Sequence, residues 1–313
     1  MEHRPDLICI GTALVDSIIR GFDPDPISAS GYRAESGSLN VGGEAVNEAV
    51  AAARLGLSTG IFCSLGEDTA GDMVIEALRR SGVDLSRILR SREHPTPVTT
   101  MFVNEDGTRK SITNRAHFHN FHPEAFPDRF TDARALILGS LFRAPFDDPE
   151  IIRSVLTSAK TAGQTVFADT KLPNFRFLRL DDLQDSLPLI DYLTPNEDEA
   201  RYYSGKETPE EMADVFLSRG VGTVIIKLGG RGCLLKNARE SLFLPAFRIR
   251  AVDATGAGDN FVAGFASEIL QGASHADALR FASACGAICT TAVGAGTALV
   301  SRQQVLRFLE EQK

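Results

Sequence analysis

Short apolar runs alternate with stretches of helical periodicity along most of the chain. The apolar runs predict strands over residues 7–10, 60–64, 135–138, 165–168, 191–194 and 223–228. Helical periodicity predicts helices over residues 45–55, 71–81 and 149–162, and three more that begin at Asp259, His275 and Arg302. Strands that alternate with helices are typical of a parallel sheet covered by helices on both faces. We therefore expect an α/β fold with its active site beyond the carboxyl ends of the strands.

Two segments, 13–41 and 97–115, depart from this alternation. The second has strand-like residues on both sides of Asn104-Glu105-Asp106-Gly107, which is a hairpin signal. The first is rich in turn-forming and extended residues and has no helical periodicity. We expect both to form strands outside the main sheet and to pair into a small β-lid that excludes water from the site.

The composition fits one globular domain over residues 1–313, with the lid segments inserted in it. The chain is 43% hydrophobic and 24% charged, and its formal charge is 33 − 41 = −8. No basic stripe alternates with aromatic residues, so a nucleic-acid partner is not expected. The first residues lead into a strand without a signal-peptide core, and no apolar run approaches the roughly 18 residues that span a bilayer. We expect a soluble, cytoplasmic protein.

Two groups of residues that bind metals in other proteins are expected to be structural here. Cys285 and Cys289 share a helix face, but no second pair of ligands accompanies them. The spacing of His117, His119 and His122 in a Pro-bounded segment matches no metal site, so we expect a solvated loop. The cysteines number five and lie in apolar surroundings, which indicates reduced core residues; they are Cys9, Cys63, Cys233, Cys285 and Cys289.

Residues 252–261, VDATGAGDNF, carry the strongest chemical signal. Gly256, Ala257 and Gly258 leave their backbone N–H groups uncovered directly before a predicted helix. The helix N-terminus adds a partial positive charge, so this segment is suited to bind phosphate. Asp259 places a carboxylate beside it. A proton acceptor next to an anion site is the minimal equipment for phosphoryl transfer.

Residues 41–56, VGGEAVNEAVAAARLG, form a second informative segment. Gly42 and Gly43 let the backbone approach a ligand closely at the start of a helix. Asn47 lies one turn into that helix, where its amide can both donate to and accept from a polyol hydroxyl. By itself, the segment is equally compatible with a well-capped core helix.

Together, GGEAVNEAVAAARLG and DATGAGDNF resemble the two signatures of the ribokinase family of carbohydrate kinases, the PfkB family. The similarity extends from GTALVD near the start to GAGTA near the end, whereas the phosphate loop and the catalytic loop of other kinase scaffolds are lacking. It implies a three-layer ribokinase-like sandwich with a mostly parallel central sheet and a small β-lid. It also implies phosphorylation of a sugar by ATP, with Mg²⁺ as a cofactor.

The resemblance assigns roles to the two segments. Asp259 corresponds to the family's catalytic base, which takes the proton of the attacking hydroxyl. The amides of Gly256, Ala257, Gly258 and Asp259 would form an anion hole for the transferring phosphoryl group. Asp16, in GTALVD, corresponds to a carboxylate that holds sugar hydroxyls, although such a residue can also cap a turn. The complete set that would hold the sugar is Asp16, Gly42, Gly43 and Asn47.

Further motifs of the resemblance concern the nucleotide. The family's Asn-x-x-Glu motif, here Asn196 and Glu199, helps to position Mg²⁺ and phosphates, although the same spacing is typical of helix capping. KLGGRGC matches the family's nucleotide loop, and Lys227 stands where Thr or Ser is more frequent. Its amine either reaches an ATP phosphate or is a solvent-exposed strand end. The other nucleotide-binding positions are Gly229, Gly230, Gly232 and Ser283.

A monovalent cation, usually K⁺, is a further cofactor in many relatives. Asp253 and Thr255 match positions that hold it. Cys289, Ala292 and Gly294 would offer only backbone carbonyls, which suffice for such an ion. The resemblance therefore implies a K⁺ site beside the glycine-rich segment.

Departures from the family's pattern reduce the range of sugars expected as the substrate. Ribokinases have an Asn two residues before the first Asp and a Glu after the middle strand, where this chain has Leu14 and Leu141. The loss of two polar contacts argues against ribose. GTALVD and LGS look more like fructokinases and 2-keto-3-deoxygluconate kinases than like ribokinase. Of the Asp-Pro-Asn-x-Arg motif of those relatives, Asp169 is retained and Arg176 is displaced.

The sequence thus predicts transfer of phosphate from ATP to a primary hydroxyl of a ketose or sugar acid, such as fructose or 2-keto-3-deoxygluconate. A phosphorylated sugar would require several cations, for which the lid offers Arg109 and Lys110. A nucleoside kinase of the same family and a non-catalytic sugar or nucleotide sensor are the alternatives, and the retained Asp259 argues against the sensor. Relatives commonly dimerise through paired lids, so we also expect a homodimer.

Overall fold

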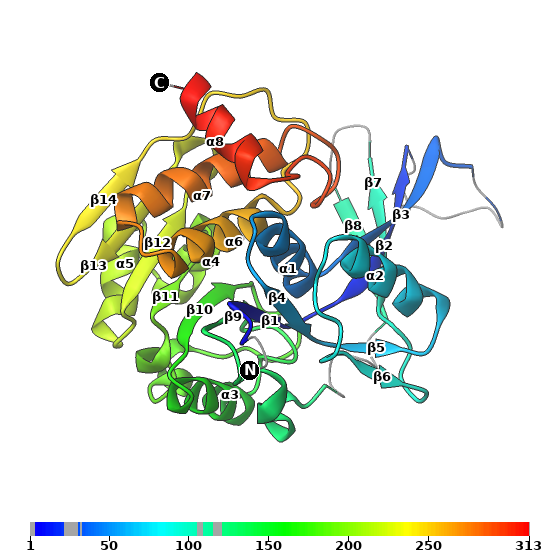
Figure 1. The fold of residues 1–313 in the computed structure, drawn as a ribbon, viewed down its shortest axis with the longest axis horizontal. Coiled ribbons are helices and arrows are strands. Elements are labelled where there is room, and N and C mark those ends of the chain that lie inside the picture. The colour runs from blue at the N-terminus through cyan, green and yellow to red at the C-terminus, as the bar shows by residue number, and fades with distance from the viewer. Residues whose placement is uncertain (1–3, 22–30, 32, 105–108, 115–120, 313) are drawn as a thin grey trace.

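The computed structural model describes residues 4–21, 31, 33–104, 109–114 and 121–312. The strands of its main sheet are β1 (Leu7–Ile10), β4 (Thr59–Phe62), β9 (Ala135–Leu141), β10 (Thr165–Thr170), β11 (Tyr192–Leu193), β12 (Thr223–Lys227), β13 (Cys233–Asn237) and β14 (Ser241–Leu244). They are ordered β14-β13-β12-β11-β10-β9-β1-β4 (Figure 1). The strands from β12 to β4 are parallel, and β13 and β14 add an antiparallel edge.

Helices cover both faces of this sheet (Figure 1). One core contains buried residues of α1 (Glu44–Arg54), α2 (Thr69–Arg80), α6 (Ala257–Leu270), α7 (His275–Cys289) and α8 (Arg302–Glu311). The other contains buried residues of α3 (Pro149–Thr161), α4 (Glu197–Ser204) and α5 (Pro209–Ser218). Alternate residues of β1 enter the two cores, Leu7 and Cys9 the first, Ile8 and Ile10 the second. This alternation follows from the two-residue period of a strand and produces the three layers.

A second sheet forms the predicted lid. It consists of β2 (Leu14–Arg20), β3 (Ser36–Gly42), β7 (Val98–Val103) and β8 (Arg109–Thr113), in the order β3-β2-β7-β8. Its pairing is mixed, because β2 is parallel to β7 and the outer pairs are antiparallel. A short parallel pair, β5 (Ser64–Gly66) and β6 (Leu89–Ser91), lies beside it (Figure 1). The ribokinase-like α/β fold with a β-lid is confirmed, whereas the predicted turn at 105–107 lies outside the described residues.

The register of the lid places one row of side chains over the site. Asp16 of β2 is opposite Thr99 of β7, which is opposite Thr113 of β8, and all three line the main pocket. The adjacent row points to the other face, where Leu39 is 59% and Ile112 is 70% exposed. The lid thus presents a row of polar side chains to the pocket, beside Leu14 and Met101, and carries apolar side chains on its outer face.

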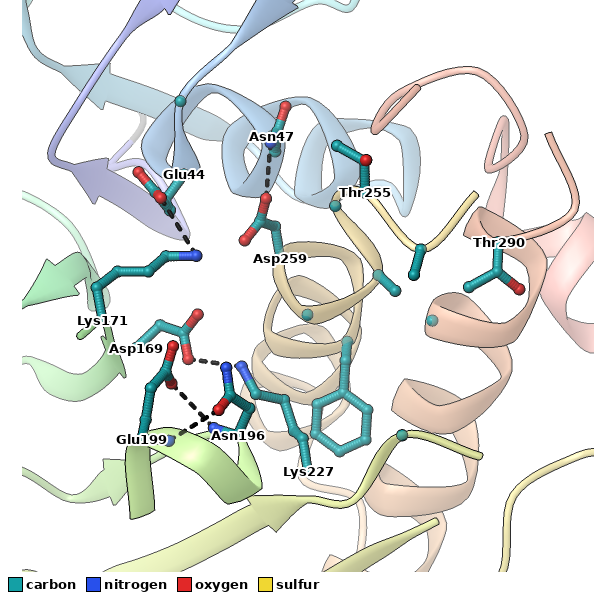
Figure 2. Close-up of a pocket in the computed structure, with 18 of the residues that line it drawn as sticks. Glu44, Asn47, Asp169, Lys171, Asn196, Glu199, Lys227, Thr255, Asp259 and Thr290 are labelled. Atoms are coloured by element: carbon teal, nitrogen blue, oxygen red, sulfur yellow. Dashed lines mark hydrogen bonds and ion pairs between the residues drawn. The ribbon is translucent and has the colours of Figure 1, made fainter. Parts of the chain in front are cut away.

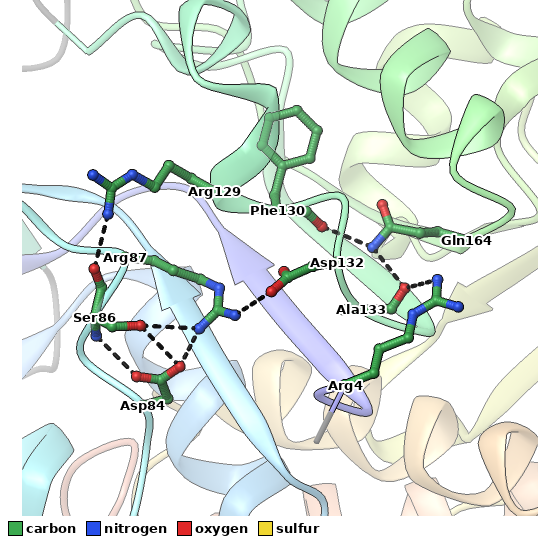
Figure 3. Close-up of polar contacts among 9 residues, drawn as sticks. All are labelled: Arg4, Asp84, Ser86, Arg87, Arg129, Phe130, Asp132, Ala133 and Gln164. Carbon is green, nitrogen blue, oxygen red and sulfur yellow. Dashed lines mark hydrogen bonds and ion pairs between the residues drawn. The ribbon is translucent and has the colours of Figure 1, made fainter. Parts of the chain in front are cut away.

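A polar network attaches the segment before β9 to the rest of the molecule (Figure 3). The Arg87 guanidinium bridges Asp84 and Asp132, and its Nη2 lies 2.6 Å from the Asp132 carboxylate. The Gln164 amide donates to the carbonyl oxygens of Phe130 (2.8 Å) and Ala133 (3.2 Å). These bonds satisfy backbone groups of a non-helical segment and hold the chain where it enters β9.

The predicted and observed elements differ mainly in the last third of the chain. Pattern analysis missed α5 and the antiparallel strands β13 and β14. The two strands were missed because β13 follows β12 after one short turn and breaks the strand–helix alternation. All five cysteines are free and buried, as predicted. His122 is close to Glu124, and His117 and His119 lie outside the described residues. Among the helices of the described residues, none has the length and apolarity to cross a bilayer.

Candidate active site

A pocket of about 1150 Å³ lies between the lid and the carboxyl ends of the parallel strands. Asp169 at the end of β10, Lys227 at the end of β12 and the first turns of α1 and α6 contribute to its wall. This is the expected place for a ligand in an open α/β sheet. The sequence-predicted residues that line it are Asp16, Gly43, Asn47, Asn196, Glu199, Lys227, Gly229, Gly230, Gly232, Thr255, Gly256, Ala257, Gly258, Asp259 and Ser283. Gly42 and Asp253 do not line it.

The start of α6 presents backbone N–H groups to the pocket. Gly256 is the N-cap and has φ +76°, a conformation that favours glycine. A Cβ there would also overlap Ala295. The Ala257 N–H already donates to Ala254 O (3.2 Å), whereas those of Gly258 and Asp259 have no backbone acceptor among the described residues. Two amides of the predicted anion cradle are therefore available, since the first N–H groups of a helix lack intrahelical partners.

Asp259 lies in the first turn of α6 and is 6% exposed. Its Oδ2 accepts a hydrogen bond of 2.6 Å from Nδ2 of Asn47 on α1 (Figure 2). Burial raises the pKa of the Asp259 carboxyl to about 6, against the opposing effect of the Lys171 ammonium. Asn47 thus fixes the orientation of Asp259, a contact between two segments 212 residues apart in sequence.

An ion pair between Glu44 and Lys171 was missed by sequence reasoning. The Lys171 Nζ lies 3.2 Å from the Glu44 carboxylate, and Thr12 Oγ1 donates to the same carboxylate (2.5 Å). Burial alone would raise the pKa of Glu44, but Lys171 and Thr12 lower it to about 2. Figure 2 shows the Lys171 amine between the Glu44 and Asp259 carboxylates. The available signal was a carboxylate directly after Gly42-Gly43, with a lysine two residues after Asp169.

The glycines before α1 make room for Asp16. A Cβ at Gly42 would lie 2.5 Å from Asp16 Oδ2, and a Cβ at Gly43, which has φ +100°, would overlap Thr12 O. Gly42 therefore acts on the pocket through Asp16 rather than by lining it. Burial, with a contribution from Glu44, raises the pKa of the Asp16 carboxyl to about 6.

Lys227 is not a solvent-exposed strand end, because its side chain is only 13% exposed. Its Nζ donates to Asp169 Oδ1 (2.7 Å), and Thr194 Oγ1 donates to the same oxygen (2.9 Å). A Cβ at Gly258 would lie 3.2 Å from the Lys227 Nζ, which places this amine directly beside the N-terminus of α6. The Lys227 ammonium therefore lies beside the predicted anion cradle, where it is paired with the Asp169 carboxylate.

Asn196 and Glu199 form a capping box at the start of α4. Asn196 Oδ1 accepts from the Glu199 N–H (2.9 Å), and Glu199 Oε2 accepts from the Asn196 N–H (3.0 Å) and from Thr170 Oγ1 (2.7 Å). Both residues also line the pocket. Burial, with a contribution from Asp169, raises the pKa of the Glu199 carboxyl. Asn196 and Glu199 therefore both cap the helix and line the pocket.

The glycine-rich turn after β12 leads into β13. Gly232 has φ +114°, and a Cβ there would overlap Leu244 O, so the turn requires glycine at this position. No atom of the described residues lies within 4 Å of a Cβ built on Gly229 or Gly230, which leaves their backbone open to the pocket. The Ser283 hydroxyl lies on α7, 3.7 Å from the Cys233 thiol.

Asp253 and Thr255 form a closed local turn. Asp253 Oδ1 accepts from the N–H (3.0 Å) and the hydroxyl (2.7 Å) of Thr255, and its Oδ2 accepts from the Gly294 N–H (3.0 Å). The carbonyl of Gly294 accepts from Thr297. These contacts connect the loop before α6 to the loop after α7.

The described side chains of Lys110 and Arg176 do not line the pocket. Lys110 is exposed on β8 and does not line it. The side chain of Arg109 lies outside the described part of the chain. Arg176 pairs with Asp148 away from the pocket lining. Leu14 lines the pocket, whereas Leu141 is buried in the core.

Comparison with known proteins places this geometry in a family. The family model "pfkB family carbohydrate kinase" matches residues 4–302. The chain belongs to the PfkB family of carbohydrate kinases. It is therefore an ATP-dependent phosphotransferase, in a family whose typical activity is the phosphorylation of sugars.

Individual PfkB relatives differ in substrate. The chain is 31% identical to ribokinase of Haemophilus influenzae over 277 residues, 86% of this chain and 87% of that protein. It is also 31% identical to 2-dehydro-3-deoxygluconokinase of Bacillus subtilis over 289 residues, 88% of each. The sequence identity to this ribokinase is thus equal to the identity to this 2-dehydro-3-deoxygluconokinase. The prediction that the chain is less similar to ribokinases is not reproduced.

Solved structures of PfkB relatives share the fold. Arabidopsis thaliana ribokinase in complex with ribose and ATP superimposes with a TM-score of 0.87 at 28% identity, over 98% of this chain and 99% of that chain. An E. coli protein in complex with ATP and Mg²⁺ superimposes with a TM-score of 0.77 at 26% identity, over 98% and 99%. The lid and the three layers are therefore common to these structures and this chain.

Proposed function

We propose that this protein phosphorylates a primary hydroxyl of a small unphosphorylated sugar, a ketose or a sugar acid, with Asp259 as the base. The observation that carries the proposal is the position of the Asp259 carboxylate, buried in the first turn of α6 beside free backbone N–H groups and oriented by Asn47. A base next to an anion site can deprotonate a hydroxyl and stabilise the charge on the group that it attacks.

In this mechanism the protein supplies position and charge. Asp259 accepts the proton of the acceptor hydroxyl, and the N–H groups of Gly258 and Asp259 donate to the oxygens of the transferring phosphoryl group. Gly256 and Ala257 give the chain the turn that exposes those groups. Lys227 adds its ammonium at the same place. Pre-positioned donors of this kind require little reorganisation during transfer.

The sugar is held from the lid side and from α1. Asp16 accepts hydrogen bonds from hydroxyls, with Gly42 and Gly43 leaving space for it. Asn47 contributes its carbonyl oxygen, because its Nδ2 is engaged with Asp259. The lid covers the acceptor with the row that contains Thr99 and Thr113, which excludes water from the reacting atoms.

The nucleotide occupies the part of the pocket formed by the turn after β12 and by α7. The open backbone of Gly229 and Gly230 and the Ser283 hydroxyl are suited to pack against a nucleotide, and Gly232 is required by the turn. The Glu199 carboxylate keeps two hydrogen bonds, so it would hold Mg²⁺ through water, beside Asn196. When bound, Mg²⁺ neutralises charge on the phosphates. Asp253 and Thr255 would support K⁺ nearby.

The charges near Lys171 favour an unphosphorylated substrate. Lys171 is neutralised by Glu44. Arg143 also lines the pocket and uses two nitrogens for Leu172 O, which leaves further N–H groups for a ligand. The Arg143 guanidinium suits a single carboxylate or keto oxygen, whereas a phosphate dianion is usually held by several cations.

The experiment that tests this function is ATP turnover by the purified protein against a panel of ketoses, sugar acids, ribose, sugar phosphates and nucleosides. We expect turnover to be strongest with an unphosphorylated ketose or sugar acid. Turnover confined to nucleosides would instead establish the nucleoside kinase. ATP binding without turnover on any acceptor would contradict the proposal and favour a sensor.

The pH dependence of sugar binding follows from Asp16. The Asp16 pKa of about 6 means that the carboxyl becomes neutral below that pH and loses acceptor capacity for sugar hydroxyls. We expect the KM for the sugar to rise as the pH falls below about 6, and Asp16→Asn to have a high KM that does not vary over the same range. Initial rates between pH 5 and 8, with saturating ATP, measure this. A KM with equal pH dependence in both proteins would exclude Asp16.

The outer face of the lid supports a further proposal, that two chains pair through their lids. Leu39 and Ile112 lie on the same face and are largely exposed. We expect the wild type to elute as a dimer in gel filtration and a Leu39→Asp, Ile112→Asp variant to elute as a monomer. A wild-type monomer at micromolar concentration would contradict this.

A further inference from the structure

Three carboxylates from separate elements converge below the pocket. Glu48 of α1, Asp169 of β10 and Asp259 of α6 each offer one oxygen, and these oxygens all lie within 4.8 Å of one another. All three residues are buried, and Asp169 and Asp259 also line the pocket. Repulsion between such groups is expensive in a buried environment unless protons or cations compensate it.

Glu48 is the unusual member of this group. The residue is 0% exposed, and neither of its side-chain oxygens has a hydrogen-bond partner among the described residues. Its charged neighbours are the carboxylates of Asp259, Asp169 and Glu44 and the ammonium of Lys227. That ammonium is bonded to Asp169 instead. A buried carboxylate without a partner therefore points into a space already lined by two others.

The other two carboxylates have coordination capacity left. Asp169 uses Oδ1 for Lys227 and Thr194, and Asp259 uses Oδ2 for Asn47. No hydrogen bond to the second oxygen of either residue is found among the described contacts. A carboxylate accepts at about four lone-pair positions, so Asp259 can bind a cation and still accept a proton.

Protonation of Glu48 is the competing explanation. A protonated glutamic acid is a hydrogen-bond donor, and it would be expected to donate to Asp169 or Asp259 at this spacing. Neither Glu48 oxygen makes such a bond. The three oxygens converge, but Glu48 donates no hydrogen bond to the other two residues. This arrangement fits a cation between the oxygens better than a proton shared by them.

We propose that Glu48, Asp169 and Asp259 bind a hard divalent cation, Mg²⁺ or Mn²⁺, directly and without nucleotide. Carboxylate oxygens are the hard donors that these ions prefer, and water molecules would complete the coordination. The site is separate from the Mg²⁺ assigned to Glu199 through water. It does not depend on the identity of the sugar, nor on whether the protein phosphorylates a sugar at all.

The test is Mn²⁺ binding to the full chain without ATP or sugar, followed by the loss of the EPR signal of free Mn²⁺. We expect one Mn²⁺ per wild-type chain. In Glu48→Gln, affinity should fall at least about tenfold, since even the loss of an outer-shell contact costs about 10–100-fold. Glu199→Gln is the matched control, because its carboxylate is in the same pocket but outside the trio, and it should retain most of the affinity.

Thermal unfolding provides a second readout. Without metal, Glu48→Gln should be at least as stable as the wild type, because it removes an unpartnered buried carboxylate. At one fixed Mn²⁺ concentration, the Tm of the wild type and of Glu199→Gln should rise clearly more than the Tm of Glu48→Gln. No Mn²⁺ binding by the wild type, or equal binding by Glu48→Gln, would overturn the proposal. Loss of binding in Glu199→Gln alone would place the cation at the capping box and would also overturn it.

Discussion

The Asp259→Asn variant should lose about 10²–10⁴-fold in kcat, the range that a positioned general base contributes. Asparagine has nearly the same shape, and its carbonyl can still accept the hydrogen bond that Asn47 donates to Asp259. The variant should therefore fold, and ATP should bind with little change. The protein should lose only the group that accepts the proton. Steady-state kinetics with the best sugar of the panel, together with calorimetric titration of ATP, separate these effects.

A matched control removes the same charge elsewhere. Asp185 is exposed and does not line the pocket, so Asp185→Asn should keep wild-type kcat and KM. If Asp259→Asn retained kcat within about tenfold of the wild type, which is below the range for base catalysis, Asp259 would not be the base. Loss of both ATP binding and thermal stability would instead mean that the substitution disrupts the start of α6.

Sequence patterns were sufficient for the parallel part of the fold. Strand β1 occurs where its apolar run predicts it, because four buried residues between two helix-covered faces leave a continuous apolar signal. The antiparallel strands β13 and β14 were missed. In β14, exposed and half-buried residues alternate over only four positions, which is too short to be distinguished from a loop.

The features of the candidate site likewise fall into those that the sequence could predict and those that it could not. Asp259 and the glycines around it could be predicted because a local turn and a helix start determine their geometry. The contacts from Asn47 to Asp259, from Lys171 to Glu44 and from Lys227 to Asp169 could not, since each joins distant segments. Glu48 could not be recognised from the sequence either, because there it is an ordinary residue of the helix α1. Only the tertiary structure brings it close to Asp169 of β10 and Asp259 of α6.

The Glu44–Lys171 ion pair should show strong coupling in a double-mutant cycle. Their side chains are 18% and 27% exposed, so breaking the pair should cost near the lower end of the roughly 3–5 kcal/mol seen for buried pairs. We expect Lys171→Met to destabilise more than Glu44→Gln, because the lysine also faces Asp259 and Asp169. The double variant should be more stable than the sum of the single losses predicts. Urea unfolding of the four proteins measures the coupling.

The same cycle has a pH dependence whose sign is fixed by Glu44. Its pKa is lowered from 4.5 to about 2, so the pair stabilises the fold fully above about pH 4.5 and progressively less as the pH falls toward 2. The stability difference between the wild type and Glu44→Gln should therefore shrink in acid. For the same reason, Lys171→Met should reduce the free energy of unfolding less at low pH, since protonated carboxyl groups are no longer stabilised by the charge of a neighbouring ammonium group. Strictly additive losses that do not vary with pH would show that the two residues are neighbours without energetic coupling. Coupling that fades in acid would mean that Glu44 and Lys171 hold their part of the pocket wall together by charge.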